Sequence, residues 1–178
     1  ELNLGYGLTE ASPETHNNPP GRVKVGTIGI PIMDTDAKIV DAGTGLKELS
    51  SGEVGELVVK GPQVMKGYLA NEDETKIALR NGWLYTGDLA LMDDEGYFRI
   101  VDRKKDLIKY KGYSVFPVEL EDLLYKHPSV KECAVVGKPS PEVGEIPKAY
   151  IVIKDGATTT KDELLEFCDI RIAPYKKI

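Results

Sequence analysis

Short runs rich in apolar residues, separated by Gly- and Asp-containing turns, follow one another through residues 26–102. Short apolar runs bounded by turn residues are typical of strands, so we predict strands at residues 37–40, 55–60, 84–92 and 97–102. The turn Asp93-Asp94-Glu95-Gly96 joins the last two as a hairpin, because its glycine accepts positive φ. One short helix is predicted at residues 73–80. The regular spacing of the strands indicates a small β-barrel or a distorted sheet.

Residues 11–24 depart from this pattern, because they contain three prolines and a glycine. Proline fixes φ and lacks the N–H that the interior of a helix requires. We therefore predict an extended loop here, without a helix.

After residue 102 the spacing of apolar residues becomes helical. Residues 115–126 are predicted to form a helix, because Pro117 suits the first turn and Glu119, Glu121 and Asp122 complement the N-terminal dipole. Its apolar stripe consists of Phe116, Leu120, Leu123 and Leu124.

Residues 130–137 and 148–154 have the composition of strands. Thr160 and Glu163 form a possible capping box that opens a helix through about residue 169. Its inward face is expected to carry Leu164, Leu165 and Cys168. The predicted class is α+β, with residues 1–102 as a barrel-like or sheet subdomain and residues 103–178 as a small α+β domain.

Composition narrows the class of protein. With 178 residues, 41% of them hydrophobic and 29% charged, the chain resembles a globular protein. No apolar run approaches the roughly 20 residues of a membrane helix, and no basic-then-apolar leader is visible. We expect a cytoplasmic protein and leave peripheral membrane attachment and oligomeric state open.

The chain has two cysteines and two histidines, and these four residues are far apart in the sequence. Cys133 and Cys168 lie among apolar neighbours, which indicates free thiols in a reducing compartment. His16 and His127 have no Cys or carboxylate cluster beside them, so a structural zinc site is not expected.

The charge is unevenly distributed. The chain has a net charge of −6, but residues 1–102 carry nine Lys and Arg against 17 Asp and Glu, whereas residues 103–178 carry 14 against 12. Overall acidity argues against nucleic acid as a partner. The basic cluster at the start of residues 103–178 indicates either a binding site for a small polyanion or a solvated charged face. Its members are Arg103, Lys104, Lys105, Lys109 and Lys111.

Three short segments combine turn-forming glycines or charges with groups that bind nucleotides. They are Gly5-Tyr6-Gly7-Leu8-Thr9-Glu10, Tyr85-Thr86-Gly87-Asp88 and Asp102-Arg103-Lys104-Lys105-Asp106. The first offers an aromatic face, a hydroxyl and a carboxylate on a loop where two glycines let the backbone approach a ligand closely. The second offers an acceptor for a ribose diol, and the third a guanidinium for phosphate or ribose oxygens. A Rossmann fingerprint is excluded, because Glu10 stands where its third glycine should be.

In this order and approximate spacing, the segments resemble motifs of the AMP-forming acyl-CoA synthetases, within the adenylate-forming ligase superfamily. The likeness is to the C-terminal part of a fatty-acid–CoA ligase and runs through nearly the whole chain. It includes Gly55-Glu56-Leu57, Gly61 and Gly67-Tyr68-Leu69. The resemblance implies that a carboxylic acid reacts with ATP and Mg²⁺ to give an acyl-adenylate, from which coenzyme A takes the acyl group.

The resemblance also implies roles in the first segment. Tyr6 would stack on adenine, and Thr9 would contact the phosphates. Glu10 would hold Mg²⁺ with waters around it. Gly5 and Gly7 would let the acyl carboxylate approach the backbone.

Further roles follow from the other two segments. Asp88 would accept both ribose hydroxyls, although a Thr-Gly-Asp turn by itself is more often a structural cap. Arg103 would bind ribose and phosphate. Lys105 occupies the hinge position, Lys109 resembles a lysine near the adenylate in the thioester-forming state, and Gly112 would border the pantetheine arm of coenzyme A.

Other features are expected to be structural. The Gly61–Leu69 segment is assigned to ordering the sheet, and Glu119 and Glu121 to the helix dipole. His16 stands in a context similar to fatty-acyl and medium-chain ligases, with packing and direct substrate contact both open.

The family's Ser/Thr/Gly-rich phosphate loop and its C-terminal catalytic lysine are not found in the chain, since Lys176 and Lys177 precede that lysine's motif. We therefore expect a fragment that does not adenylate alone. The alternatives for the function are an aryl-acid ligase, a ligase that charges a carrier protein, or a non-catalytic binding module.

Overall fold

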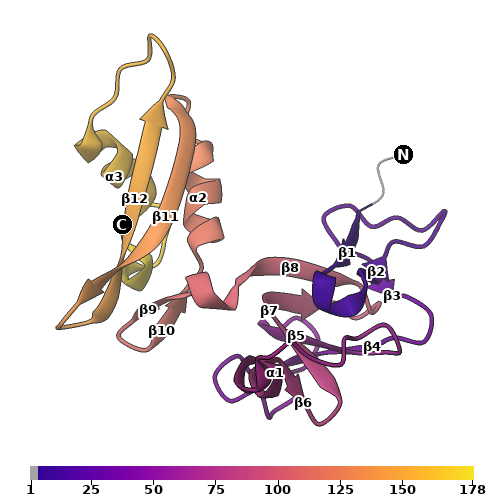
Figure 1. The fold of residues 1–178 in the computed structure, drawn as a ribbon. Helices are drawn as coiled ribbons and strands as arrows, with labels where there is room; N and C mark the ends of the chain where they lie inside the picture. The colour runs from indigo at the N-terminus through magenta and orange to yellow at the C-terminus, as the bar shows by residue number, and fades with distance from the viewer. Residues whose placement is uncertain (1–3) are drawn as a thin grey trace. The chain divides into compact units, whose positions relative to one another are not determined.

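The computed structural model describes residues 4–178 and divides into two compact units, with the boundary between Lys104 and Lys105 (Figure 1). The described residues form three α-helices and three antiparallel sheets, none of them closed. The predicted α+β class is confirmed, and the β-rich part consists of distorted open sheets. None of the described helices is both long enough and apolar enough to cross a membrane.

The main sheet of the first unit has five strands. The order is β4-β5-β7-β6, and β8 also pairs with β7. The four predicted strands are present and close to the expected lengths. The strands are β4 (Asp36–Val40), β5 (Gly55–Lys60), β6 (Leu79–Arg80), β7 (Trp83–Met92) and β8 (Phe98–Arg103).

The helix of this unit, α1 (Glu72–Ala78), is shorter than the predicted span of 73–80. Asn71 caps it by accepting a hydrogen bond from the Glu74 N–H. The last two predicted residues instead form β6 and pair with Trp83 and Leu84. The hairpin turn between β7 and β8 is as predicted, with Gly96 at φ 80°.

A second, three-stranded sheet contains β1 (Gly5–Gly7), β2 (Glu14–Asn17) and β3 (Ile30–Pro31). The prediction of a loop through residues 11–24 is wrong for β2. Its four residues lie between the prolines, at positions 13 and 19–20, so every N–H that the ladder needs is available. Tyr6 faces His16 in the β1–β2 register, and the short 3-10 helix η1 (Thr9–Ala11) connects the two strands.

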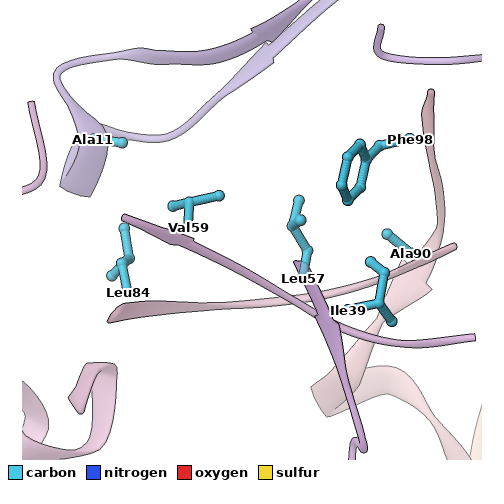
Figure 2. Close-up of a cluster of buried hydrophobic side chains, with 7 residues drawn as sticks. All are labelled: Ala11, Ile39, Leu57, Val59, Leu84, Ala90 and Phe98. Atoms are coloured by element: carbon cyan, nitrogen blue, oxygen red, sulfur yellow. The ribbon is translucent and has the colours of Figure 1, made fainter. Parts of the chain in front are cut away.

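The core of the first unit lies where these elements meet. Figure 2 shows apolar side chains from η1, β4, β5, β7 and β8 converging on one region. They are Ala11, Ile39, Leu57, Val59, Leu84, Ala90 and Phe98. Truncating a residue such as Leu57, which is fully buried, would cost about 2–5 kcal/mol of stability.

The second unit is one four-stranded sheet with two helices. The strand order is β10-β9-β12-β11. Its elements are β9 (Ile108–Tyr110), β10 (Tyr113–Val115), α2 (Pro117–Tyr125), β11 (Val130–Ser140), β12 (Gly144–Ile153) and α3 (Lys161–Asp169). Two 3-10 helices, η2 (Lys104–Asp106) and η3 (Pro174–Lys176), complete the chain.

For this unit the predicted helix start and strand lengths need adjustment, and the predicted capping box does not. The helix predicted at 115–126 begins at Pro117, because Val115 ends β10. The strands predicted at 130–137 and 148–154 continue toward each other as one long hairpin. The capping box is confirmed, since Thr160 accepts from the Glu163 N–H and Glu163 accepts from the Thr160 N–H.

The core of the second unit packs α2 and α3 against the sheet. It contains Ile108, Val115, Leu120, Leu123, Leu124, Val135 and Cys168. Leu164 is buried as predicted, but Leu165 is only half-buried, and Phe167 packs against the core in its place. Cys133 and Cys168 are both free thiols, as predicted.

Candidate nucleotide-binding site

A bulge in β7 shapes the Thr86-Gly87-Asp88 segment. On β5 a single residue, Leu57, separates the partners of Tyr85 and Leu89, whereas β7 has three residues between them. Thr86 stabilises the extra residues of the bulge. Its hydroxyl donates to the Leu57 carbonyl at 2.8 Å and accepts from the Asp88 N–H at 3.1 Å. Because such a bulge redirects a side chain out of the regular ladder, it presents Asp88 at the edge of the core.

Asp88 is the meeting point of two predicted site residues. The Tyr6 hydroxyl donates to Asp88 Oδ2 at 2.5 Å, and Arg103 Nε lies 3.9 Å from Asp88 Oδ1. Asp88 and Arg103 are also direct partners in the β7–β8 register. The structure therefore brings together three residues that are up to 97 positions apart in the sequence.

Burial and charge act strongly on Tyr6. Burial raises the pKa of its hydroxyl, and the Asp88 carboxylate that accepts its hydrogen bond raises it further. Tyr6 thus remains a hydrogen-bond donor across the physiological range. Arg103, by contrast, has 66% of its side chain exposed, which leaves its guanidinium accessible to a ligand.

Glu56 contacts the bulge through a hydrogen bond to Gly87, and the sequence analysis did not assign it a role. Its side chain is 4% exposed, and Oε1 accepts from the Gly87 N–H at 3.2 Å. Its Oε2 accepts from Lys104 Nζ at 2.6 Å. The only signal in the sequence was the Gly55-Glu56-Leu57 motif.

Glu10 is contacted by the segment that the sequence assigned to structure. The Tyr68 hydroxyl donates to Glu10 Oε1 at 2.7 Å, and the Met65 N–H donates to the Glu10 carbonyl at 2.8 Å. The hydrogen bond to Glu10 raises the pKa of Tyr68 to about 12. Tyr68 therefore adjoins the predicted site, and no local pattern indicated this. Thr9, the neighbour of Glu10, is exposed in η1.

Of the two glycines predicted to face the acyl carboxylate, the fold itself requires Gly7. A Cβ on Gly7 would lie 1.9 Å from the Pro13 carbonyl oxygen, where the register of β1 and β2 shifts. A Cβ on Gly5 would lie 2.9 Å from Glu14 Oε1. Backbone packing therefore explains Gly7 whether or not a ligand approaches it.

His16 is completely buried in β2. Its Nδ1 lies 2.9 Å from Thr15 Oγ1, and its ring packs edge-on against Phe98, while Nε2 has no hydrogen-bond partner among residues 4–178. Burial lowers the pKa of His16 to about 4, so the ring is neutral at physiological pH. These contacts identify His16 as part of the packing around Tyr6, whose ring lies 5.9 Å away.

The remaining predicted residues lie in the second unit. Lys105 is the middle residue of η2, directly after the boundary between the units. Lys109 Nζ donates to Ser114 Oγ at 2.8 Å, and its backbone N–H donates to Glu145. Gly112 has φ 83° in the tight turn between β9 and β10, and a Cβ there would meet no atom within 4 Å.

The acidic residues of α2 have partners beyond the helix dipole. Glu121 Oε1 accepts from the Val135 N–H at 2.7 Å, which joins α2 to β11. Glu119 accepts from Lys176 Nζ at 2.6 Å. The assignment of both residues to the dipole alone is thus incomplete, although both remain structural.

A magnesium site made of protein ligands alone is not found among residues 4–178, which contain no cluster of three His, Cys, Asp or Glu side chains able to hold a metal. Mg²⁺ in nucleotide enzymes typically takes one or two carboxylates and completes its shell with phosphates and waters. Glu10 fits this mode, because only one of its carboxylate oxygens accepts the Tyr68 hydrogen bond.

Comparisons with known proteins identify the family of the chain. The family model for the AMP-binding enzyme matches residues 1–69, and that for the AMP-binding enzyme C-terminal domain matches residues 119–178. The chain belongs to the AMP-binding enzyme family and matches the C-terminal part of its fatty-acid–CoA ligases.

Individual relatives make the likeness more specific. The long-chain-fatty-acid–CoA ligase of Bacillus subtilis (strain 168) is 51% identical over 174 residues, which are 97% of this chain and 31% of the relative. ATP-bound MatB from Rhodopseudomonas palustris is 38% identical with a TM-score of 0.88, covering 97% of this chain and 34% of that one. The o-succinylbenzoate coenzyme A synthetase of Bacillus subtilis, in complex with ATP and magnesium ion, is 36% identical with a TM-score of 0.81, covering 98% and 36%. The chain thus spans about one third of the length of these relatives.

Proposed function

We propose that this chain is the downstream segment of an AMP-forming acyl-CoA ligase that activates a fatty acid. The observation that carries the proposal is the convergence of Tyr6 and Arg103 on Asp88 in the first unit. A carboxylate flanked by an aromatic hydroxyl and an accessible guanidinium is suited to a ribose diol next to a phosphate. The B. subtilis long-chain-fatty-acid–CoA ligase, at 51% identity, favours a fatty acid as the substrate.

In this proposal Asp88 accepts hydrogen bonds from the ribose hydroxyls. Tyr6 orients the Asp88 carboxylate through its own hydroxyl and offers its ring to adenine. The Arg103 guanidinium binds ribose and phosphate oxygens, where its fixed charge stabilises the negative charge that builds up as pyrophosphate leaves.

Glu10 and Thr9 serve the phosphate side. Glu10 is the protein ligand for Mg²⁺, and Thr9 donates its hydroxyl to a phosphate. When bound, Mg²⁺ neutralises phosphate charge and favours release of pyrophosphate. Tyr68 donates to one oxygen of Glu10, so the other oxygen would be available to bind Mg²⁺.

The second unit supplies the thioester-forming step. We assign Lys105 to the hinge, Lys109 to the neighbourhood of the adenylate in that step, and Gly112 to the passage for the pantetheine arm of coenzyme A. The open space around Gly112 supports its assignment, and the position of Lys105 directly after the boundary between the units supports the hinge. The domains of the enzyme would divide near residue 102, and its location would be the cytoplasm.

An aryl acid is the second candidate substrate. The likeness to o-succinylbenzoate coenzyme A synthetase, at a TM-score of 0.81, favours it. A ligase that charges a carrier protein, or a folded module without turnover, would keep the same fold. The isolated chain should not adenylate, because the phosphate loop and the C-terminal lysine of the family lie outside it.

The test is a substrate screen with the intact protein that contains this chain. With ATP, Mg²⁺, coenzyme A and a fatty acid, it should release AMP and pyrophosphate, and omission of any one component should prevent formation of the thioester. Faster turnover of aryl acids than of any fatty acid would select the second candidate. Release of ADP and phosphate would reject the AMP-forming reaction.

A further inference from the structure

Glu56 is a buried carboxylate that accepts hydrogen bonds from two protein donors, and its burial limits the access of water that could replace them. Its side chain is 4% exposed, and each of its oxygens accepts one hydrogen bond. A buried charge is costly unless it is paired and hydrogen-bonded. Loss of either hydrogen bond would therefore cost free energy, which restrains Glu56 and both of its donors.

The two donors adjoin the two charged residues of the nucleotide site. Gly87, whose N–H bonds Oε1, directly precedes Asp88, and Lys104, whose ammonium bonds Oε2 at 2.6 Å, directly follows Arg103. Since Asp88 and Arg103 are register partners on β7 and β8, one carboxylate joins the chain beside both of them.

We propose that Glu56 is a positioning residue that sets the orientation of Asp88 and Arg103 toward the ribose of the nucleotide. It acts through the Gly87 N–H and the Lys104 ammonium and touches no substrate itself. The inference rests on the proposed function, in which Asp88 accepts the ribose hydroxyls.

The chemistry requires an acceptor at both oxygens of Glu56. In Glu56→Gln the volume is kept, but one oxygen becomes an NH₂ group that faces either the Gly87 N–H or the Lys104 ammonium, donor against donor. Adding Lys104→Gln removes this conflict, because the new amide offers an oxygen to the NH₂ group. The single variant should therefore disturb the bulge, and the double variant should restore it.

The experiment measures dissociation constants of ATP and of 2′,3′-dideoxy-ATP for the intact protein. Their ratio isolates the ribose contact and does not change when part of the protein is unfolded, because both nucleotides bind the same folded fraction. Wild type should prefer ATP by about tenfold, as expected for hydrogen bonds to a charged group. Asp88→Ala should remove this preference.

Glu56→Gln should lower the ratio by about threefold or more, and Glu56→Gln with Lys104→Gln should return it to within about twofold of wild type. Lys104→Met leaves Glu56 intact and removes only the ammonium, so it decides the matter if Glu56→Gln does not fold. It should also lower the ratio. The control is Glu48→Gln, since Glu48 pairs with Lys38 at 3.3 Å on the surface of the same unit.

Two results would overturn the inference in different ways. An unchanged ratio in Glu56→Gln or, failing that, in Lys104→Met, with a lost preference in Asp88→Ala, rejects Glu56 and leaves the proposed function intact. A wild-type protein that does not distinguish the two nucleotides rejects the role of Asp88, and the inference with it. A double variant that stays as low as Glu56→Gln contradicts the requirement for two acceptors.

Discussion

The Tyr6 hydroxyl donates a hydrogen bond of 2.5 Å to the Asp88 carboxylate, across 82 positions of sequence. This contact connects the β1–β2 sheet to the bulge of β7. It also places the aromatic ring proposed for adenine directly beside the carboxylate proposed for ribose. The base and sugar sides of the site therefore depend on each other through one hydrogen bond.

Asp88→Ala and Arg103→Ala are each expected to weaken the use of ATP at least about tenfold, because each removes a charge-assisted hydrogen bond of about 1.5–3 kcal/mol. The measurement is kcat/KM for ATP in the intact protein. Arg99→Ala is the matched control, since Arg99 is an exposed arginine on the same strand as Arg103. Unchanged ATP kinetics in both site variants would count against the site.

Acid is expected to destabilise the first unit through His16. The folded pKa of about 4 lies below the ordinary 6.5, so the unfolded chain binds a proton that the folded chain excludes. Stability is unaffected above pH 6.5 and falls by up to roughly 3 kcal/mol as the pH decreases toward 4. Asp41, Asp93 and Glu163 have lowered carboxyl pKa values, so their own losses begin only near pH 4.5 and below.

Urea unfolding of the chain at several pH values checks this expectation. The fluorescence of Trp83, the single tryptophan, reports on β7 of the first unit. His16→Gln should flatten the pH dependence between 4.5 and 6.5, whereas His127→Gln should not. A dependence that persists in His16→Gln would assign the effect to another group.

Gly7→Ala is expected to lower the stability of the first unit. The new Cβ would lie 1.9 Å from a backbone oxygen, and overpacking of this kind costs about 1–3 kcal/mol. Gly43→Ala is the control, because its Cβ would lie 3.4 Å from the nearest atom, a carboxylate oxygen of Asp41. Equal unfolding midpoints for the two variants in urea would show that β1 can move away from Pro13.

Lys105→Pro is expected to spare adenylation and stop thioester formation, because proline fixes a backbone torsion at the proposed hinge. The two half-reactions are measured separately, as pyrophosphate release without coenzyme A and as thioester formed from supplied acyl-adenylate. Lys105→Ala, which keeps the torsion free, should retain both. Loss of the first half-reaction alone would contradict a hinge.

The sequence predicted what depends on local pattern. Apolar runs between turn residues located β5 and β7, and the Thr160–Glu163 spacing located the start of α3. The strand β2 was missed, because its four residues stand among prolines and are stabilised by pairing with β1 and β3. Asp88 and Arg103 were assigned to the candidate site through their motifs. Nothing local indicated that Tyr68 reaches Glu10, 58 positions away, or that Glu56 reaches Lys104, 48 positions away.

Tyr6, Asp88 and Arg103 all precede Lys105, so the three residues proposed to hold the nucleotide belong to one unit. If the enzyme works as proposed, the second unit can rotate between half-reactions without loosening that hold. The acyl-adenylate, a reactive mixed anhydride, would then stay bound while the second unit changes position. Its hydrolysis would be limited because the intermediate is not released.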